Sequence, residues 1–519
     1  METRFIMVQG TASHVGKSVL AAALCRIFYR DGYRVAPFKS QNMALNSFVT
    51  RDGGEMGRAQ VVQAEAAGVE PSVDMNPILL KPTGQASSQV IVLGRPVGNM
   101  PAHRYHNDYA PQALDIIEGA LGRLRSRYEV IVIEGAGSPA EVNLQEREIV
   151  NMRIARMVEA PVLLVADIDK GGALASVVGT LDLLAPADRE RVSGVIINKF
   201  RGDLSLFRPA VAFLEQKTGK PVLGVVPYYQ NLRIQEEDTI PEKCYGAGDV
   251  LPGSEKVEIA VIRLPHISNF TDFDPLEDEP DVRLRYIDRG GKPGENIDLI
   301  ILPGSKNTIE DLAFLRREGL ADWIIARART GTPVIGICGG FQMLGREMND
   351  PFHTESRIPR SEGLGLLDIA TTFEPEKITT QVEAEAAGPG IFLSGATGYR
   401  IAGYEIHMGR TELASGISPA FNILVQSGKD VILPDGAVSS DGHVFGTYIH
   451  GIFDHDVFRR HIINVLRRRK GIGLPPERQT IPVSEQRQRD FDRLAAVVRE
   501  SLDMGAVYRL LNLPGPRSN

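Results

Sequence analysis

Residues 5–28, FIMVQGTASHVGKSVLAAALCRIF, join a short apolar run to a glycine-bounded loop and then to a second apolar stretch. Phe5–Gln9 is typical of a strand, and the apolar residues between Val19 and Phe28 recur with the spacing of one helix face. A loop between a strand and a helix N-terminus directs backbone N–H groups at an anion. The stretch therefore predicts a phosphate-binding loop, with five residues between Gly10 and Gly16 where the usual loop has four.

The loop carries the side chains that nucleoside triphosphate chemistry requires. Lys17 is expected to bridge β- and γ-phosphate oxygens, and the Ser18 hydroxyl to bind Mg²⁺. The alternative is a glycine-rich turn without a ligand, which the flanking strand and helix disfavour. The predicted nucleotide-binding residues are Gly10, Thr11, Gly16, Lys17, Ser18, Lys39 and Asn198.

Acidic residues near the ends of predicted strands are candidate metal ligands. Glu134 ends the apolar run VIVIE and is expected at the ligand edge of a parallel sheet, although a capping role stays open. Asp52 and Glu55 lie in RDGGE, where metal binding and an ordinary glycine turn are equally good interpretations. The predicted metal ligands are Ser18, Asp52, Glu55 and Glu134.

Other polar residues of the first half can hold a nucleotide or an acidic substrate. Lys39 follows a short strand at the same edge, and Gln41 and Asn42 beside it can donate hydrogen bonds to phosphate or carboxylate oxygens. Asn198 ends the run GVIIN and can bind a base edge, while Arg201 can hold an acidic substrate.

The alternation of apolar runs with helical stretches predicts two doubly wound α/β domains followed by a helical tail. The polar, Gly- and Pro-rich residues 236–256 are typical of a linker, so the expected domains are 1–235 and 257–456, with C-terminal helices over 457–519. Residues 374–390 are charged and broken by glycine and proline, which favours a surface loop. The strands expected in the two domains are 5–9, 130–134, 162–167, 194–198, 222–226, 258–264, 297–302, 334–337 and 444–449.

A second reactive site is indicated by VIGICGGFQMLG, residues 334–345. A buried strand that runs into a tight glycine turn and a helix is the geometry of a nucleophile elbow, which exposes Cys338 at the strand tip. The helix N-terminus favours its thiolate, and backbone N–H groups at Gly339 and Gly304 can stabilise an oxyanion. Cys25 is expected to fill the core, and Cys244 lies in the linker without a partner.

The base for this cysteine must be one of ten histidines. His450 ends the β-branched run VFGTYIH, so the sheet can deliver it to the edge that holds Cys338. His407 in GYEIHMG ends another expected strand and is assigned to the substrate pocket.

Composition narrows the class of protein. The chain of 519 residues is longer than a single hydrophobic core usually organises, so more than one domain is expected. Its content of 43% hydrophobic and 24% charged residues is typical of folded globular proteins. A net charge of −7 gives no broad cationic surface for nucleic acid. No apolar run approaches the ~18 residues of a membrane span, the start lacks a signal-peptide pattern, and three unpaired cysteines fit a reducing compartment. We expect a cytoplasmic protein, and no sequence feature indicates an oligomeric state.

Taken together, the motifs resemble glutamine-hydrolysing cobyric acid synthases. The motifs that carry the resemblance are GTASHVGKS (10–18), FKSQNMALNS (38–47), NPILLKP (76–82), EGAGSPAE (134–141), DIDKGG (167–172), NKFRGD (198–203), GICGGFQMLG (336–345), GYEIHMG (403–409) and GTYIHG (446–451). The resemblance implies an N-terminal domain similar to dethiobiotin synthetase and a C-terminal class I glutamine amidotransferase domain. It implies that ATP, Mg²⁺ and glutamine serve to amidate the b, d, e and g carboxylates of adenosylcobyrinic a,c-diamide.

The resemblance also suggests roles for single residues. Cys338 matches the nucleophile and His450 the base, and Gln342 falls where class I amidotransferases help to hold glutamine. Gln41, Asn42, Lys81 and Arg201 lie in the matching motifs and are candidate substrate-binding residues. One position departs from the class I pattern, because Ile452 stands where most members have a glutamate. We therefore predict a Cys–His pair without a third member, and assign Asp454 to helix capping.

The two sites suggest one reaction. Phosphorylation of a corrin carboxylate gives an acyl phosphate, and Cys338 releases ammonia from glutamine to displace the phosphate. A sheltered route between the domains would keep the ammonia unprotonated. The alternatives are the related a,c-diamide synthase, which acts on other carboxylates, and a nucleotide-switched scaffold with an inactive amidotransferase domain.

Overall fold

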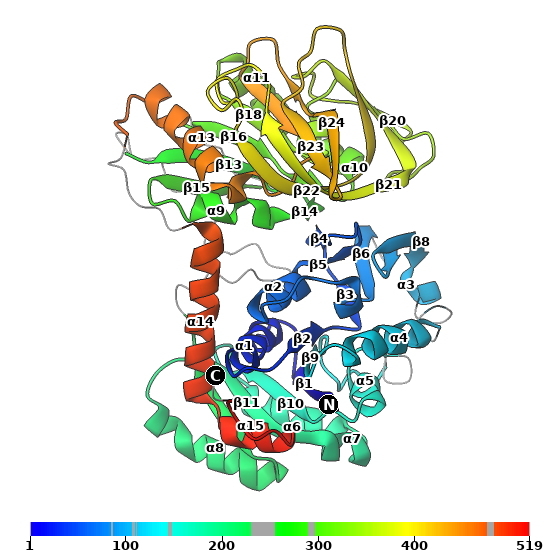
Figure 1. The fold of residues 1–519 in the computed structure, drawn as a ribbon, viewed down its shortest axis with the longest axis vertical. Coiled ribbons are helices and arrows are strands. Elements are labelled where there is room, and N and C mark those ends of the chain that lie inside the picture. The colour runs from blue at the N-terminus through cyan, green and yellow to red at the C-terminus, as the bar shows by residue number, and fades with distance from the viewer. Residues whose placement is uncertain are drawn as a thin grey trace.

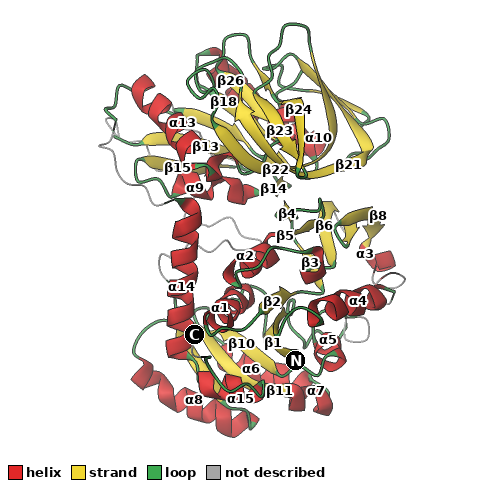
Figure 2. Cartoon of the chain, in the orientation of Figure 1, coloured by secondary structure: helices red, strands yellow, loops and turns green. Residues whose placement is uncertain are grey.

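The computed structural model describes residues 2–84, 87–105, 109, 112–143, 148–229, 255–288, 296–474 and 482–517. The chain forms two lobes, one above the other in Figure 1, with the first half of the sequence in the lower lobe. Each lobe is built on a β-sheet with helices packed against it (Figure 2). This confirms the predicted α/β architecture. Of the expected linker, only residues 255 and 256 are described.

The lower lobe is centred on a parallel sheet with the strand order β12-β11-β10-β1-β9-β2. Because the strands are parallel, their carboxyl ends share one edge, which is where the predicted nucleotide-binding residues lie. The strands are β1 (Arg4–Gly10), β2 (Val35–Phe38), β9 (Val130–Glu134), β10 (Val162–Asp167), β11 (Val192–Phe200) and β12 (Val222–Pro227).

Alternate residues of the central strand β1 enter two different cores. Phe5 and Met7 pack with α4, α5 and α6 on one face, and Ile6 and Val8 pack with α1 on the other. The sheet is therefore buried on both faces, which explains its nearly continuous apolar strands. The helices of this lobe are α1 (Lys17–Arg30), α2 (Arg58–Ala66), α3 (Ala102–Arg104), α4 (Ala113–Arg125), α5 (Met152–Met157), α6 (Ala173–Leu183), α7 (Pro186–Arg191) and α8 (Leu204–Thr218).

Two small sheets connect the ligand edge of this lobe to the upper lobe. One has the order β3-β6-β7-β8, and the other is the hairpin β4–β5. Figure 1 shows both between the large parallel sheet and the upper lobe. Their strands are β3 (Gln41–Met43), β4 (Ser47–Val49), β5 (Glu55–Gly57), β6 (Ile78–Gly84), β7 (Ser87–Val92) and β8 (Arg95–Pro101).

The upper lobe contains a second sheet with the order β15-β13-β16-β18-β26-β25, in which β25 alone is antiparallel to its neighbour. The strands are β13 (Val257–Ile262), β15 (Val282–Ile287), β16 (Leu299–Leu302), β18 (Val334–Ile337), β25 (Ala437–Val438) and β26 (Val444–Thr447). Its helices are α9 (Asp274–Glu277), α10 (Thr308–Arg317), α11 (Leu320–Arg329), α12 (Gly339–Met343) and α13 (Asp456–Arg469). A two-stranded pair, β14 (Ile267–Ser268) and β17 (Gly304–Ser305), lies beside the elbow of Cys338.

A long antiparallel sheet completes the upper lobe and corrects one prediction. Residues 374–390 were expected to form a surface loop, but most of them belong to the 18-residue strand β21 (Ile369–Ala386), which pairs with β22 (Arg400–Leu413). The segment has a charged, exposed face and a buried face. The polar residues of the exposed face make the strand look like a loop in the sequence. The other strands of this sheet are β19 (Glu347–Asn349), β20 (Arg360–Glu362), β23 (Phe421–Gln426) and β24 (Lys429–Asp435).

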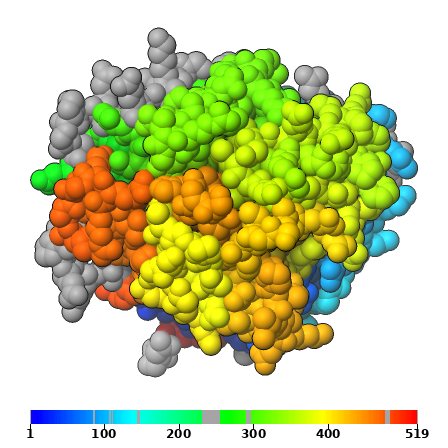
Figure 3. Space-filling view, turned by 90° about the horizontal axis from the view of Figure 1, so that it is seen from above, coloured from blue at the N-terminus to red at the C-terminus, as the bar shows by residue number. Residues whose placement is uncertain are grey.

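The C-terminal helices divide between the lobes instead of forming a unit of their own. Helix α13 contributes Phe458 and Ile462 to the upper core and ends at Arg469, two residues before Gly471. Helices α14 (Val483–Ser501) and α15 (Met504–Leu510) pack against α1 and β12 of the lower lobe. Seen from above, the upper lobe covers most of that face, with the lower lobe visible only at the margins (Figure 3).

The helices in the described part of the chain include none with the length and apolar character of a membrane span.

Candidate active site

The predicted phosphate loop follows β1 and leads directly into α1. Gly16 has a φ of 95°, and a Cβ there would lie 2.2 Å from Asn198 Nδ2, so glycine is required for both its conformation and its close packing. Asn198 donates from Nδ2 to Val15 O at 2.9 Å and holds the loop, while its buried Oδ1 has no hydrogen-bond partner in the described residues. The Lys17 ammonium donates to Ala12 O at 2.9 Å and to Gly137 O at 3.2 Å.

Glu134 is the centre of a buried polar cluster beside this loop. Its Oε1 accepts hydrogen bonds from Ser18 Oγ at 2.7 Å and Lys39 Nζ at 3.1 Å, and its Oε2 accepts one from Gln63 Nε2 at 2.6 Å. Burial alone would raise the pKa of Glu134, but Lys39, together with the donors Ser18 and Gln63, holds it below the usual value. An ionised carboxylate next to a hydroxyl offers the oxygen ligands that Mg²⁺ prefers.

The structure separates the other two predicted metal ligands from this cluster. Asp52 is exposed and accepts a hydrogen bond from Thr50 Oγ1 at 2.5 Å within its turn. Glu55 is buried and pairs with Lys81 and Lys377 instead. Asp52 and Glu55 therefore do not lie with Ser18 and Glu134, and the prediction that they share a metal site with them was wrong. The glycine turn directs the chain away from the ligand edge and toward the upper lobe.

The candidate substrate residues have different surroundings. Gln41 Oε1 accepts a hydrogen bond from Tyr105 OH at 2.5 Å, and Asn42 donates to Gln60 Oε1 at 3.0 Å. Arg201 pairs with Asp169 at 2.8 Å, and its guanidinium lies 3.4 Å from the ring centroid of Tyr228. Lys81, also a candidate substrate residue, lines the pocket that holds Cys338.

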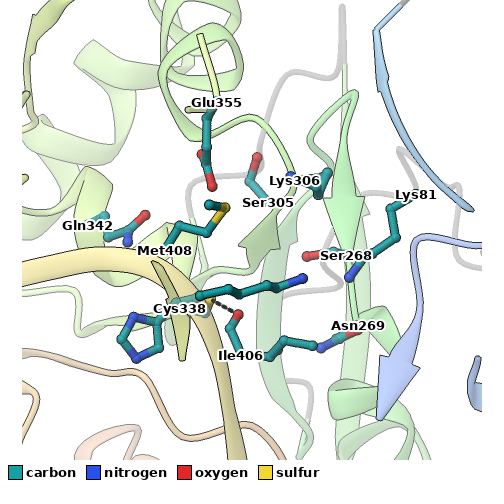
Figure 4. Close-up of a pocket in the computed structure, with 12 residues that line it drawn as sticks. Lys81, Ser268, Asn269, Ser305, Lys306, Cys338, Gln342, Glu355, Ile406 and Met408 are labelled. Carbon is teal, nitrogen blue, oxygen red and sulfur yellow. Dashed lines mark hydrogen bonds between the residues drawn. The ribbon is translucent and has the colours of Figure 1, made fainter. Parts of the chain in front are cut away.

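Cys338 lies at the predicted elbow between β18 and α12. Its φ of 51° is rare for a residue with a side chain, and such strain is typical of a nucleophile held at a sharp turn. A Cβ on Gly339 would lie 2.8 Å from Ser305 N, so the turn requires a glycine there. The thiol donates to Ile406 O at 3.5 Å (Figure 4).

His450 is completely buried and has a carboxylate partner that the sequence did not reveal. Asp272, in a short 3-10 helix (Phe270–Phe273), places Oδ2 2.6 Å from His450 Nδ1, and its Oδ1 accepts a hydrogen bond from Gly451 N at 3.2 Å. The predicted Cys–His pair without a third member was therefore wrong: the geometry is that of a triad. Asp454 caps no helix, since α13 has His455 at its N-cap and no side-chain cap.

Burial and Asp272 act in opposite directions on the pKa of His450. Burial opposes protonation, but the carboxylate of Asp272 and the nearby Cys338 raise the pKa of His450 to about 10. His450 Nε2 has no hydrogen-bond partner among the described residues, so this nitrogen is available for proton transfer. Gly304 lies beside the ring, where a Cβ would be 3.2 Å from His450 Cε1.

The lower lobe reaches the triad through its β4–β5 hairpin. Ser47 N donates to Asn269 Oδ1 at 3.0 Å, and Ser47 O accepts a hydrogen bond from Tyr404 OH at 3.1 Å. The Tyr404 ring in turn stacks on His450, with centroids 5.2 Å apart. A backbone segment of one lobe thus contacts the residues that position the base in the other.

Cys338 lines a pocket to which both lobes contribute residues. Gln342 lines it, accepting from Thr308 Oγ1 and donating to Tyr448 OH at 3.2 Å each. His407 also lines it and stacks on Tyr448. The lining residues, most of them labelled in Figure 4, are Lys81, Ser268, Asn269, Ser305, Lys306, Cys338, Gln342, Glu355, Lys377, Ile406, His407 and Met408.

Comparisons with known proteins agree with these two sites. Residues 6–241 match the CobQ/CobB/MinD/ParA nucleotide binding domain, and residues 258–458 match the CobB/CobQ-like glutamine amidotransferase domain. The chain is 57% identical over 515 residues to the cobyric acid synthase of Pelotomaculum thermopropionicum, covering 99% of this chain and 97% of that protein. It is 56% identical over 511 residues to that of Moorella thermoacetica, with 98% of each chain covered.

The chain belongs to the cobyric acid synthase family. It is accordingly an enzyme, and the upper lobe is its glutamine amidotransferase domain and the lower lobe its nucleotide-binding domain. Cys338, His450 and Asp272 lie in the amidotransferase lobe, and the nucleotide-binding lobe contributes Lys81 to the pocket of Cys338.

Sequence reasoning also missed residues other than Asp272. Gln60 and Gln63 are buried on α2 one turn apart, and two glutamines among buried apolar residues were a signal that this helix face serves a polar site. Lys306 and Glu355 gave no comparable signal, because each lies in a polar loop that looks exposed until the fold is known.

Proposed function

We propose that this enzyme forms cobyric acid by amidating the b, d, e and g carboxylates of adenosylcobyrinic a,c-diamide, with ATP and glutamine as co-substrates and Mg²⁺ as the metal. The family supports the corrin product, and the two domains support the use of a nucleotide and of glutamine. Amidation at all four positions and the route through an acyl phosphate are our inference.

The nucleotide-binding lobe supplies the residues that activation needs. Ser18 and Glu134 would hold Mg²⁺, which when bound neutralises charge on the β- and γ-phosphates. Lys17, beside the loop, would stabilise the charge that develops when a corrin carboxylate oxygen attacks the γ-phosphorus. The Lys39 ammonium, 3.1 Å from Glu134, adds positive charge at the same edge. The product of this step is an acyl phosphate.

The amidotransferase lobe supplies ammonia. The Cys338 sulfur attacks the side-chain amide of glutamine, and His450 delivers a proton from Nε2 to the departing nitrogen. Asp272 holds the imidazolium through Nδ1, which fixes the ring and favours the charged form. Water then hydrolyses the thioester and releases glutamate.

The observation that carries this proposal is the shared pocket. Lys81 from β6 and Lys377 from β21 line the same cavity as Cys338, so the nitrogen is released where the two lobes meet. Ammonia released at such a boundary can reach the acyl phosphate without entering bulk water, where protonation would remove its nucleophilicity.

The test uses Cys338→Ala with two nitrogen sources. The variant should fail to amidate with glutamine but should do so with a high concentration of ammonium at alkaline pH, because only ammonia release requires the sulfur. Failure with ammonium in a folded variant would contradict separable sites. Assaying cobyrinic acid in parallel distinguishes this activity from that of an a,c-diamide synthase.

A further inference from the structure

Lys306 places a buried ammonium in the pocket of Cys338. It follows the β17 strand, and its residue is only 8% exposed. Its backbone is fixed, because Lys306 N donates to His266 O at 2.9 Å and the neighbouring Ser305 Oγ donates to Asp311 at 2.6 Å. Within the described residues, the Lys306 ammonium makes no hydrogen bond or ion pair. A buried charge without a partner is costly, so this position indicates an absent anion.

Glu355 is the one carboxylate that lines the pocket in the part of the chain that the structure describes. Its loop is preorganised by Asp350, whose carboxylate accepts hydrogen bonds from the backbone N–H groups of Thr354, Glu355 and Ser356 at 2.7–3.0 Å. One Glu355 oxygen accepts from Thr308 N at 3.3 Å. Figure 4 shows the carboxylate pointing into the cavity on the side of Gln342 and Met408.

Lys306 and Glu355 act on each other without forming an ion pair within 4.0 Å. Burial lowers the pKa of Lys306, and Glu355 is the main charge that opposes this shift. Burial likewise raises the pKa of Glu355, and Lys306 is the main charge that opposes it. Lys306 and Glu355 are therefore a cation and an anion that are close enough to interact but far enough apart for a ligand to join them.

The other two lysines of the pocket are already paired with a carboxylate. Glu55 accepts from Lys81 at 2.9 Å through one oxygen and from Lys377 at 2.5 Å through the other. Lys81 also donates to Ser47 Oγ, and Lys377 to Gln89 Oε1. Lys306 is thus the ammonium best placed to bind a new carboxylate.

We propose that Lys306 binds the α-carboxylate of the substrate glutamine and that Glu355 binds its α-ammonium. This inference deepens the proposed function, because it assumes that glutamine is the nitrogen donor. When the side-chain amide of glutamine lies at Cys338, the α-carboxylate can accept a hydrogen bond from Lys306 and the α-ammonium can donate one to Glu355. Both hydrogen bonds are charge-assisted. Lys306 and Glu355 are specificity-determining residues, and they take no part in breaking the amide bond.

The first test uses the unaltered enzyme and two truncated substrates. Glutaramate is glutamine without the α-amino group, and 4-aminobutanamide is glutamine without the α-carboxylate. Release of ammonia from each should show a kcat/KM about 10- to 100-fold below that for glutamine, as expected for a lost hydrogen bond to a charged group. Equal kcat/KM values for glutamine and for either analogue would overturn the proposal for the corresponding residue.

The second test pairs variants with analogues. In Glu355→Gln, the preference for glutamine over glutaramate should fall about 10- to 100-fold, and in Lys306→Met the preference for glutamine over 4-aminobutanamide should fall similarly. Each variant should keep its preference at the other end. Loss of both preferences in either variant would indicate a merely structural role and would contradict the proposal.

The exposed residues Lys429 and Glu383 offer matched controls, since Lys429→Met and Glu383→Gln make the same chemical changes away from the pocket. Both controls should keep the two preferences of the unaltered enzyme, and a change of either preference in a control would count against the assignment. The proposed function fails separately, if the unaltered enzyme releases no ammonia from glutamine. An enzyme that hydrolyses glutamine but accepts both analogues equally well would refute this inference alone.

Discussion

The Lys377 ammonium of β21 lies 2.5 Å from Glu55 Oε2 of β5, so a buried ion pair joins the amidotransferase lobe to the nucleotide-binding lobe. Lys81 binds the other oxygen of the same carboxylate at 2.9 Å. Because Lys81 and Lys377 both line the pocket of Cys338, the contact that holds the lobes together also forms one wall of the glutamine site.

Glu55→Gln should weaken this interface. Burial alone would raise the pKa of Glu55, but Lys377 and Lys81 lower it from 4.5 to about 2, so the carboxylate stabilises the fold above pH 4.5 and loses this effect as the pH falls toward 2. Each pKa unit corresponds to ~1.4 kcal/mol, so the variant should lose about 3 kcal/mol near neutral pH. Thermal unfolding should show a larger difference in stability between the variant and the unaltered enzyme at pH 7 than at pH 3. Glu383→Gln is the exposed control.

Asp272→Asn should lower the pKa of His450 from about 10 toward its usual value of 6.5. In the unaltered enzyme, Asp272 stabilises the imidazolium, which is fully present below pH 6.5 and is lost as the pH rises through about 10. In the variant, His450 should lose its proton at a lower pH than this. Glutaminase kcat should fall about 10²- to 10⁴-fold. The pH profile of glutamine hydrolysis measures both effects. Asp454→Asn should change the profile much less. An unshifted alkaline limb in Asp272→Asn would contradict the triad.

Glu134→Gln should abolish amidation while leaving glutamine hydrolysis in place. The substitution removes the charge that Ser18 and Lys39 surround, so the nucleotide site loses its proposed metal ligand. Amidation with ammonium should fall by at least ~10²-fold, a loss comparable to removing one charge-stabilising group. The exposed Glu118→Gln on α4 should be fully active. Parallel loss of glutaminase activity in Glu134→Gln would show that the two sites are not separable.

Tyr404 should help to position His450, because it links this residue to Ser47 of the nucleotide-binding lobe. Tyr404→Phe removes the hydrogen bond to Ser47 O but keeps the ring on His450, whereas Tyr404→Ala removes both. We expect glutaminase kcat to fall a fewfold in the phenylalanine variant, as for one hydrogen bond, and at least ~10-fold more in the alanine variant. Steady-state glutaminase kinetics check this order. Equal activity in both variants would exclude positioning by the ring.

The sequence allowed the parallel strands and both turns to be predicted, because they depend on local patterns. Apolar runs such as 130–134 and 162–167 fall where the strands lie, and the glycine turns before Lys17 and after Cys338 fix the two sites. His450 could be placed because it follows a strand of the same sheet as Cys338.

The predictions that were wrong concern residues whose partners lie in distant segments of the chain. Asp272 reaches His450 from 178 residues away, and no periodicity relates the two. The segment around Lys377 looks polar because one face of its strand is exposed and its register shifts between Phe373 and Ile378. Glu55 was a candidate metal ligand, with an ordinary turn as the equal alternative. The sequence could not show that two lysines from separate strands pair with its carboxylate.

The most direct measurement of the central claim follows nitrogen from glutamine into the corrin. The enzyme is incubated with ATP, Mg²⁺, adenosylcobyrinic a,c-diamide and glutamine labelled with ¹⁵N at the side-chain amide, in the presence of unlabelled ammonium. If Cys338 releases the nitrogen that the nucleotide-binding lobe uses, mass spectrometry should find four ¹⁵N atoms in each product molecule. Incorporation of unlabelled nitrogen in proportion to the ammonium in solution, or product with fewer than four new amides at completion, would contradict the account.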